Sequence, residues 1–466
     1  MEIHMIGHAS ILVRTQDHTI LMDPVLWDPH QEGLFDVCPK REVLHQYLPR
    51  PDFLIISHKH LDHFDIRSLA ALPKTVKVLI PQDELIERCL SKLGYQKIYK
   101  LNDFSEIKVG ATRIMTTNSA NKVPEFGVVF ADESGVFWNQ VDTDVSSNTI
   151  DFVLSRYSRV DFVLATWQPM LELSYQFNRS MTFPYAAYNQ LLDNLRAIKP
   201  KAIAPGANAF KYIGGSSWLN RVVFPVTREQ FCRDVRLLCP ELKESIYELD
   251  PGDTLTLAHG TFQNQPGGCE FVRKIGGDRE ELDFYPVAVG RDMVDTIQEG
   301  VTPAILRKTI DEEVEKDLLL FIKDHPTLFA EHYRWKVIYQ LTVIFPDGAT
   351  KWSFDFSESA VRMRRARSPL ANLHSIITAS GFYGLLKGVH GWDYVIMGGY
   401  YRRFNKIYAV TDFGLVQPGN TQVQDPLELK FPYRRILENC LLKEIEKWQS
   451  APEPDTESRK PARSTI

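Results

Sequence analysis

The sequence lacks a long apolar run, a secretory leader and a strong net charge. None of its segments approaches the roughly 18 consecutive apolar residues that a membrane span needs, and no signal-peptide pattern opens the chain. The formal net charge of -5 over 466 residues gives no electrostatic basis for binding nucleic acid. We therefore expect neither a membrane span nor a nucleic-acid partner.

Cysteine is scarce and scattered along the chain. The six cysteines include no Cys-x-x-Cys pair, which argues against an iron–sulfur cluster or a cysteine-ligated zinc ion in this chain. Isolated cysteines of this kind favour reduced thiols and hence a cytoplasmic protein.

The length of the chain predicts two domains, because 466 residues exceed what one ordinary core accommodates. Short strands alternate with helices after a β-rich start, which predicts an α/β fold with two sheets sandwiched between helices. Glycine-rich segments at 263–268 and 276–278 mark a boundary near residue 280. We predict a first domain over 1–280, an α+β domain over 281–449 and a disordered tail over 450–466.

The second domain contains the strongest local signal for a β-hairpin. Asp347-Gly348 stands between apolar runs at 336–345 and 351–356, which predicts two strands and a tight turn. The remaining elements that we expect there are helices over 304–329 and 373–386 and strands over 392–397 and 403–411.

Histidine is also scarce, with 13 residues in all, yet three of them lie within six positions. The segment reads Ser57-His58-Lys59-His60-Leu61-Asp62-His63 and follows an apolar strand predicted over 53–56. On a strand, residues two apart share a face, so we expect His58 and His60 to chelate one ion. Asp62 and His63 follow where the strand gives way to a loop and are free to turn toward a second ion. A lone histidine is usually a packed or surface residue, but this concentration predicts a metal site.

Three further motifs accompany the histidine cluster, namely Gly7-His8-Ala9-Ser10, Met22-Asp23-Pro24 and Val141-Asp142. In order and spacing, the set resembles the metallo-β-lactamase superfamily. More narrowly, residues 52–72, 139–143, 183–210 and 392–403 are similar to the part of CMP-N-acetylneuraminate hydroxylases outside their Rieske domain. The resemblance implies a metallo-β-lactamase αββα sandwich followed by a smaller α+β domain.

The resemblance also implies a role for each motif. His58 and His60 would bind metal 1, Asp62 and His63 would bind metal 2, and Asp142 would bridge the two ions. Asp62 would in addition be the catalytic proton shuttle. Asp23 would lie behind the site and accept a hydrogen bond from a ligand imidazole. His8 is expected as a ligand, as a residue supporting a ligand, or as a packed histidine.

Two histidines that the superfamily usually supplies are missing here. One would precede the bridging aspartate, where residues 116–123 contain none, and the other would lie in 205–212, which also contains none. Metal 1 would then keep two histidines and Asp142, a set that suits Fe(II) with open positions, and metal 2 would be the weaker site. The candidates to replace the missing ligands are Asn118, Asn121, Glu125 and Asp144.

These observations leave three functions open. The first is an iron-dependent oxygenase or hydroxylase component holding one or two metal ions, which needs a separate Rieske-type or ferredoxin-type electron donor. The second is a metal-dependent hydrolase of an ester, lactone, phosphodiester or sulfate, with zinc as its usual metal and manganese as another choice. The third is a protein that binds a metal or an amphipathic ligand without turnover.

The second domain carries a hint about the substrate, which we expect to be a small molecule. Trp352, Phe354, Phe356 and the segments 380–388 and 392–394 resemble sterol-carrier-like domains, whose lipophilic pocket suits an amphipathic ligand. The alternative is that these aromatic side chains fill the core of a small domain. The segment Tyr400-Tyr401-Arg402-Arg403 is a candidate for binding an anionic group of the substrate.

Overall fold

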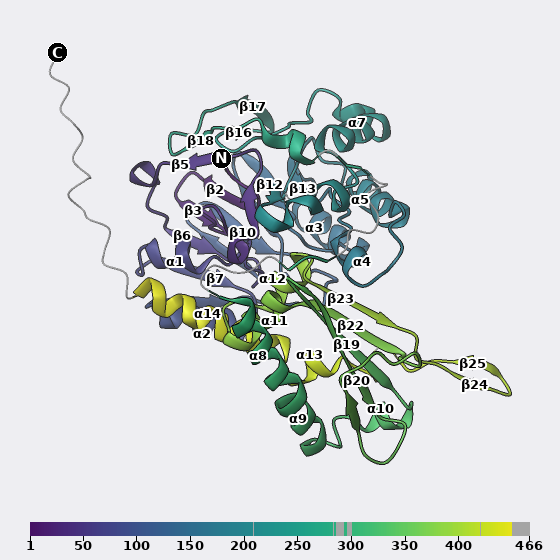
Figure 1. Ribbon diagram of the computed structural model, residues 1–466. Coiled ribbons are helices and arrows are strands. Elements are labelled where there is room, and N and C mark those ends of the chain that lie inside the picture. The colour runs from purple at the N-terminus through teal and green to yellow at the C-terminus, as the bar shows by residue number, and fades with distance from the viewer. Residues whose placement is uncertain (208, 283, 286–292, 296–300, 420, 450–466) are drawn as a thin grey trace.

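The computed structural model describes residues 1–449 except 208, 283, 286–292, 296–300 and 420, so the predicted tail over 450–466 lies outside the described residues. Its first part contains two sheets packed face to face (Figure 1). The first sheet has the order β17 (Thr261–Gln265), β16 (Thr254–Ala258), β1 (Glu2–Gly7), β2 (Ser10–Arg14), β3 (Thr19–Met22), β6 (Phe53–Ile55), β7 (Lys77–Ile80) and β8 (Lys97–Lys100). The second has the order β14 (Ala202–Pro205), β13 (Phe162–Ala165), β12 (Gly135–Asn139), β11 (Val128–Asp132), β10 (Thr112–Thr116) and β9 (Glu106–Val109).

Helices cover the outer face of each sheet, and this completes four layers. A buried apolar cluster between the sheets joins Ile11 and Ile55 of the first to Phe130 and Phe162 of the second. The outer face of the first sheet packs on α1 (Ile66–Ala71) and α2 (Glu84–Lys92), and that of the second on α3 (Ser147–Tyr157), α5 (Tyr185–Ile198) and α7 (Arg228–Leu238). The predicted αββα sandwich is confirmed.

Local sequence explains where the helices on the first sheet begin. The side chain of Asp65 accepts a hydrogen bond from the Ser68 amide and caps α1, and Asp83 caps α2 in the same way. Strand β6 ends at Ile55, so His58 and His60 lie in the loop before α1 and not on the strand where we expected them. Their side chains still meet, because the loop turns back on itself between β6 and the fixed start of α1.

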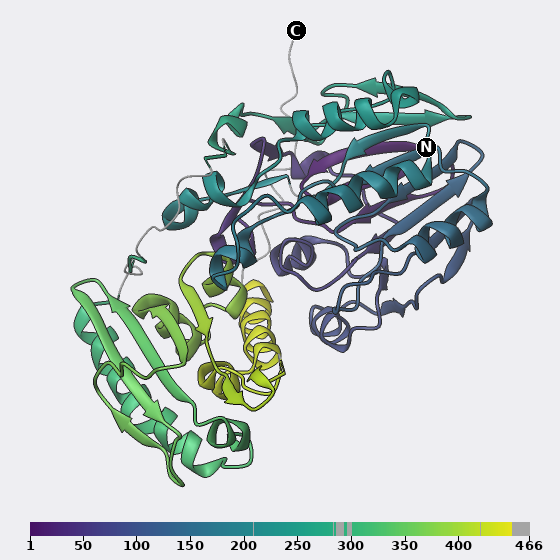
Figure 2. The same cartoon turned by 90° about the vertical axis from the view of Figure 1, so that its right-hand side faces the viewer.

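The second part of the chain forms its own five-stranded sheet with helices against it (Figure 2). The order is β21 (Arg362–Arg364), β20 (Gly348–Asp355), β19 (Ile338–Phe345), β22 (Leu373–Thr378) and β23 (Tyr401–Asn405). The predicted hairpin is confirmed as β19 and β20. The predicted helix over 304–329 is present as α8 (Pro303–Glu312), a π-helical turn over 313–318 and α9 (Leu319–Asp324), and it ends just before Pro326.

Two expectations for this domain are wrong. Residues 373–378 form a strand, because their side chains alternate between buried and half-buried, and only α11 (Ala379–Lys387) of the predicted helix is helical. Residues 392–397 form the helix α12 (Trp392–Met397), because the buried side chains of Trp392 and Val395 are three positions apart and share one helix face.

The aromatic side chains of Trp352, Phe354 and Phe356 are fully buried in the core of this domain. The resemblance to sterol-carrier-like domains stays a prediction. A hairpin of β24 (Ala409–Thr411) and β25 (Gly414–Val416) extends away from the body of the domain (Figure 1). Within the described residues, no helix is long and apolar enough to cross a membrane.

The two parts of the chain share one apolar core and are joined at two places. At the first, Phe35, Tyr175 and Tyr212 of the sandwich belong to the same buried cluster as Trp392 and Tyr401. At the second, α14 (Tyr433–Gln449) returns to the sandwich and packs against α1 and α2 (Figure 1). The predicted boundary near residue 280 stays a prediction, and the contact shows that the second part lies against the edge of the sandwich that carries the histidine motif.

Candidate metal centre

His58 and His60 face each other in the loop between β6 and α1. The Nε2 atom of His58 lies 2.9 Å from the Nδ1 atom of His60. Two nitrogens bound to one ion at about 2.1 Å lie about 3 Å apart when the angle between the bonds is near 90°. The pair is therefore spaced to chelate one ion. The pKa of His58 is well below its usual value, through burial and through the neighbouring His63 and His60, so its ring is neutral and ready to bind a metal.

Asp142 faces His63 from the opposite sheet. It follows β12, and the positive φ of 55° at Val141 turns the chain sharply before it. Its Oδ2 atom lies 3.1 Å from Nε2 of His63, whereas its buried Oδ1 atom has no hydrogen-bond partner among the described residues. A buried carboxylate oxygen without a partner is costly, and a bound cation would remove that cost. The predicted bridging residue is thus placed and oriented to receive a metal.

Asp23 fixes the orientation of two ligand rings at once. Its Oδ2 atom accepts a hydrogen bond from His63 Nδ1 at 3.0 Å, and its carboxylate also accepts from the amide and the hydroxyl of Ser57, each at 2.7 Å. The Ser57 hydroxyl in turn lies 2.9 Å from Nδ1 of His58. Both rings therefore turn Nε2 toward the site. Asp23 lies behind the site where the resemblance implied it, and Ser57 is a supporting residue that the sequence analysis missed.

His8 contacts Asp62 and is not only a packed histidine. Its Nε2 atom lies 3.0 Å from Oδ2 of Asp62, and the ring lies edge-on to that of His63 at 5.1 Å. Burial raises the pKa of Asp62, but His63 and His8 outweigh burial and hold the pKa well below its usual value. Asp62 is therefore ionised and held in place, as a ligand or a proton shuttle requires.

The predicted ligands gather into two groups that could each hold an ion. Among the residues that the structure describes, ligand atoms of His8, Asp62 and His63 lie within 4.8 Å of one another, as do those of His58, His63 and Asp142. Burial lowers the pKa of His63, but Asp142 and Asp62 outweigh it and raise the pKa well above its usual value. Positive charge is thus favoured where the two groups meet, and the donors present fit one or two metal ions.

The four candidates for the missing ligands differ in their contacts and burial. The side chain of Asn118 donates a hydrogen bond to Asp103 at 2.6 Å, and the side chain of Asp144 is exposed. Asn121 donates at 2.5 Å to Glu125, whose carboxylate also accepts from Ser119. Glu125 is buried and interacts electrostatically with both Asp142 and His60. It is the candidate best placed to serve the first ion.

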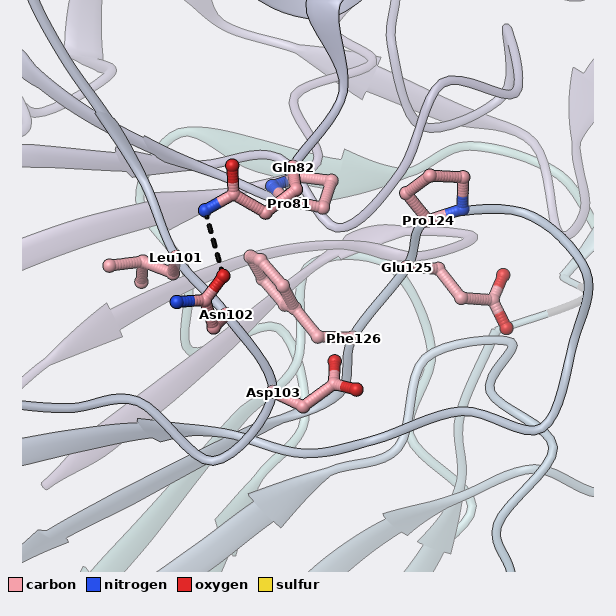
Figure 3. A pocket seen from close by; sticks show the side chains of 8 residues that line it. All are labelled: Pro81, Gln82, Leu101, Asn102, Asp103, Pro124, Glu125 and Phe126. Atoms are coloured by element: carbon pink, nitrogen blue, oxygen red, sulfur yellow. Dashed lines mark hydrogen bonds between the residues drawn. The ribbon is translucent and has the colours of Figure 1, made fainter.

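Glu125 also borders a cavity of about 380 Å³ (Figure 3). The cavity is lined by Pro81, Gln82, Leu101, Asn102, Asp103, Pro124, Glu125 and Phe126. None of these lining residues belongs to the loop that carries His58 and His60 between β6 and α1, which we call the metal loop.

Two residues near the site are not among the site residues predicted from the sequence. Glu172 begins α4 (Glu172–Gln176), and Asp393 belongs to α12 of the second domain. Glu172 interacts electrostatically with Asp142 and Asp62, and Asp393 interacts with His60 and Asp62. The one sequence signal for Glu172 is its place after β13, because β12 and β13 are parallel and the segments after them reach the same edge of the sheet.

Residues 2–145 match the family model described as the beta-lactamase superfamily domain. This segment is a beta-lactamase superfamily domain. Its strands β1 to β12 and the metal loop supply every ligand predicted from the sequence. The match ends three residues after Asp142, so the rest of the sandwich and the second domain lie beyond it.

The curated relatives match only part of this chain. A Mycobacterium tuberculosis protein named for a Rieske 2Fe-2S centre is 25% identical over 187 residues, which are 37% of this chain and 36% of that protein. A Salinibacter ruber protein named as a UPF0173 metal-dependent hydrolase is 28% identical over 109 residues, 23% of this chain and 43% of that protein. The chain thus spans about a third of the length of the Rieske-named relatives.

Two solved structures are similar to part of this chain. An isothiocyanate hydrolase from Delia radicum gut bacteria is 20% identical, covers 55% of this chain and all of its own, and has a TM-score of 0.40. The diiron β-hydroxylase CmlA from Streptomyces venezuelae is 16% identical, covers 57% of this chain and 54% of its own, and has a TM-score of 0.38.

Proposed function

We propose that this chain is the catalytic component of an iron-dependent oxygenase that receives electrons from a separate redox protein. One observation carries the proposal. The site combines His8, His58, His60 and His63 with the carboxylates of Asp62 and Asp142, while residues 116–123 and 205–212 lack the two further histidines usual in the superfamily. A donor set rich in carboxylate, with positions left open, suits Fe(II) better than a hydrolytic zinc ion, which takes strong nitrogen ligands.

Each residue has a defined part in this proposal. His58 and His60 would hold the first ion, His63 and Asp62 would hold the second, and Asp142 would serve both. Iron bound there would supply the binding and reduction of dioxygen. Asp62 carries the proton that such a reaction consumes, since His8 contacts its Oδ2 atom and the carboxylate is ionised before it accepts the proton.

We expect a separate electron donor, because the cysteines of this chain are not arranged to bind an iron–sulfur cluster. All six are free and buried, so they offer no cluster ligands, and burial raises the pKa of Cys38, Cys89, Cys232 and Cys440 to about 12. The relatives named for a Rieske centre support a partner of that kind, because about a third of each relative is similar to this chain.

We expect the substrate of this oxygenase to be a small molecule. Arg403, expected to bind an anionic group, donates to the carboxylate of Glu428 at 3.0 and 3.1 Å, so its charge is already paired. Helix α12 lies beside the metal loop through Asp393.

A hydrolase is the second candidate, favoured by the relative named as a metal-dependent hydrolase and by the complete histidine motif. Elemental analysis of aerobically and anaerobically purified protein, with spectroscopy for iron, separates the two functions. We expect about two iron atoms per chain after anaerobic reconstitution. Stoichiometric zinc without iron would refute the oxygenase proposal and favour the hydrolase.

A further inference from the structure

The hairpin of β24 and β25 extends away from the second domain and carries apolar side chains in solvent (Figure 1). Phe413 in its turn is 98% exposed, and Val410 and Leu415 are 76% and 64% exposed. Val410 and Leu415 lie directly opposite each other, so their side chains share one face of the ribbon. Single exposed apolar side chains are common, but a strip of them on one projecting ribbon is typical of a contact surface.

The hairpin is a separate two-stranded sheet. Within the described residues, β24 and β25 pair only with each other, so each strand keeps one edge of unpaired backbone groups. A two-stranded hairpin alone in water is marginally stable, because no third strand or helix covers its apolar face. A second surface that covers this face would therefore stabilise the hairpin.

Exposed apolar side chains also lie at the base of the hairpin. Phe404 on β23 is 48% exposed, and Leu370 in the loop before β22 is 73% exposed. Their two segments are joined by a hydrogen bond of 2.9 Å from the Lys406 amide to the Asn372 carbonyl. Because both side chains are in solvent, the hairpin of the same chain does not cover them.

The tip and the base of the hairpin carry opposite charges. Asp412 lies in the turn at the tip, and Lys406 lies at the base. Both side chains are exposed, and among the described residues neither forms an ion pair. Burial lowers the pKa of His374, whose ring lies 6.2 Å from that of Phe404, and the positive charges of Lys406 and Arg367 lower it further. The base is thus positive and the tip negative.

We infer that the hairpin is an arm that grips a second copy of this chain, which makes the protein a dimer with a two-fold axis. The tip of each arm lies on the base of the other arm. Phe413 then packs on the partner's Phe404 and the partner's Leu370, and Asp412 faces the partner's Lys406. A two-fold axis makes both ends meet at once, so each contact occurs twice. The inference goes beyond the proposed metal-dependent function and does not depend on it.

A lipid surface is another kind of partner that a projecting apolar hairpin could fit. The carboxylate of Asp412 opposes it, because a charged side chain is costly in hydrocarbon and is repelled by anionic headgroups. A protein surface that offers apolar side chains beside a cation accepts both Phe413 and Asp412. The base of the hairpin is such a surface, and this favours the second copy.

The first test is the mass of the full chain in solution, measured by analytical ultracentrifugation over a range of concentrations. We expect the wild type to be a dimer at about 10 μM, as a specific interface of ordinary size would be. Phe413→Ser removes the aromatic anchor at the tip and should weaken dimerisation about tenfold or more. Melting curves show whether each variant folds, and if Phe413→Ser does not, the charge variants decide.

An exchange of charges tests whether the partner is a second copy. Asp412→Lys alone and Lys406→Asp alone each place like charges together twice in the dimer, so each should weaken dimerisation about tenfold or more. An equal mixture of the two variants should restore the dimer, because the positive tip of one then meets the negative base of the other, and the reverse. The matched control is Asp151→Lys on the exposed face of α3, which should stay a dimer of wild-type affinity.

Three outcomes would overturn the inference. The first is a monomeric wild type; sedimentation of that monomer with vesicles containing phosphatidylglycerol would favour the lipid surface instead. The second is a dimer that both Phe413→Ser and the charge variants leave intact, because it would use another face. The third is a mixture of Asp412→Lys and Lys406→Asp that stays as weak as either variant alone. Metal content is measured separately, so the proposed function stands or fails independently of these results.

Discussion

The substitution Asp23→Asn tests how the two ligand rings are oriented. In the native chain the Asp23 carboxylate accepts from His63 Nδ1 at 3.0 Å and from Ser57 at 2.7 Å. Asparagine replaces one carboxylate oxygen by an NH₂ group. When its remaining oxygen accepts from the Ser57 backbone amide, the NH₂ group faces His63 Nδ1 and cannot accept its proton. The proton then moves to Nε2, which is the nitrogen that faces Asp142 and the metals.

The magnitude follows from the contacts that are lost. Losing the partner that orients a ligand histidine lowers metal affinity by about 10- to 100-fold, or about 1.4 to 2.8 kcal/mol. The metal-free protein loses at least one buried hydrogen bond to a charged group, and its free energy of unfolding falls by about 1.5 to 3 kcal/mol. The matched control is Asp151→Asn on the exposed face of α3, which should change neither quantity.

The assay is a chelator competition for metal affinity, combined with urea unfolding of the metal-free protein. We predict that Asp23→Asn folds at low urea and binds Fe(II) at least tenfold more weakly than wild type and Asp151→Asn. A folded Asp23→Asn variant with wild-type affinity would show that Asp23 does not set the tautomer of His63, and the geometry argued for the site would be wrong.

Three further predictions test other parts of the structure. The variant His58→Ala/His60→Ala should lose the first ion, and elemental analysis that finds wild-type metal content would contradict the site. Burial raises the pKa of Glu32 from 4.5 to about 8, so the folded protein holds a proton that the unfolded chain releases in that pH window. Stability should therefore fall as the pH rises from 5 to 8, and Glu32→Gln should reduce that slope in thermal melts; burial also raises the pKa of Glu172, Glu428 and Glu444 to about 7, and these account for the remainder. An unchanged slope would contradict the prediction. Arg402→Ala should lower the free energy of unfolding by about 1 kcal/mol, because its guanidinium lies over the Tyr175 ring of α4; urea unfolding identical to wild type would contradict this.

The sequence predicted the metal site better than it predicted the local structure around it. The histidine motif, Asp23 and Asp142 are close together because each follows a strand end, and strand ends meet at one edge of the sandwich. The motif itself was placed on a strand and lies in a loop. Periodicity across so few residues does not separate a strand from the loop that follows it, and the ligands meet in either case.

Glu172 had only a weak signal in the sequence, namely its place after β13. It comes from a short helix whose position depends on packing against the second part of the chain. The segment 392–397 is rich in aromatic and branched residues, which favour a strand, yet burial of Trp392 and Val395 on one side makes it a helix. Tertiary contacts outweighed local preference in each case.

The reaction with oxygen tests the central claim most directly. Iron-loaded protein is chemically reduced without oxygen, mixed with dioxygen, and followed by optical absorbance and an oxygen electrode. The account predicts rapid oxygen uptake in proportion to bound iron, and none in the His58→Ala/His60→Ala variant. Absence of oxygen uptake by the reduced wild type, together with ester or lactone hydrolysis by the zinc-loaded form, would contradict the account.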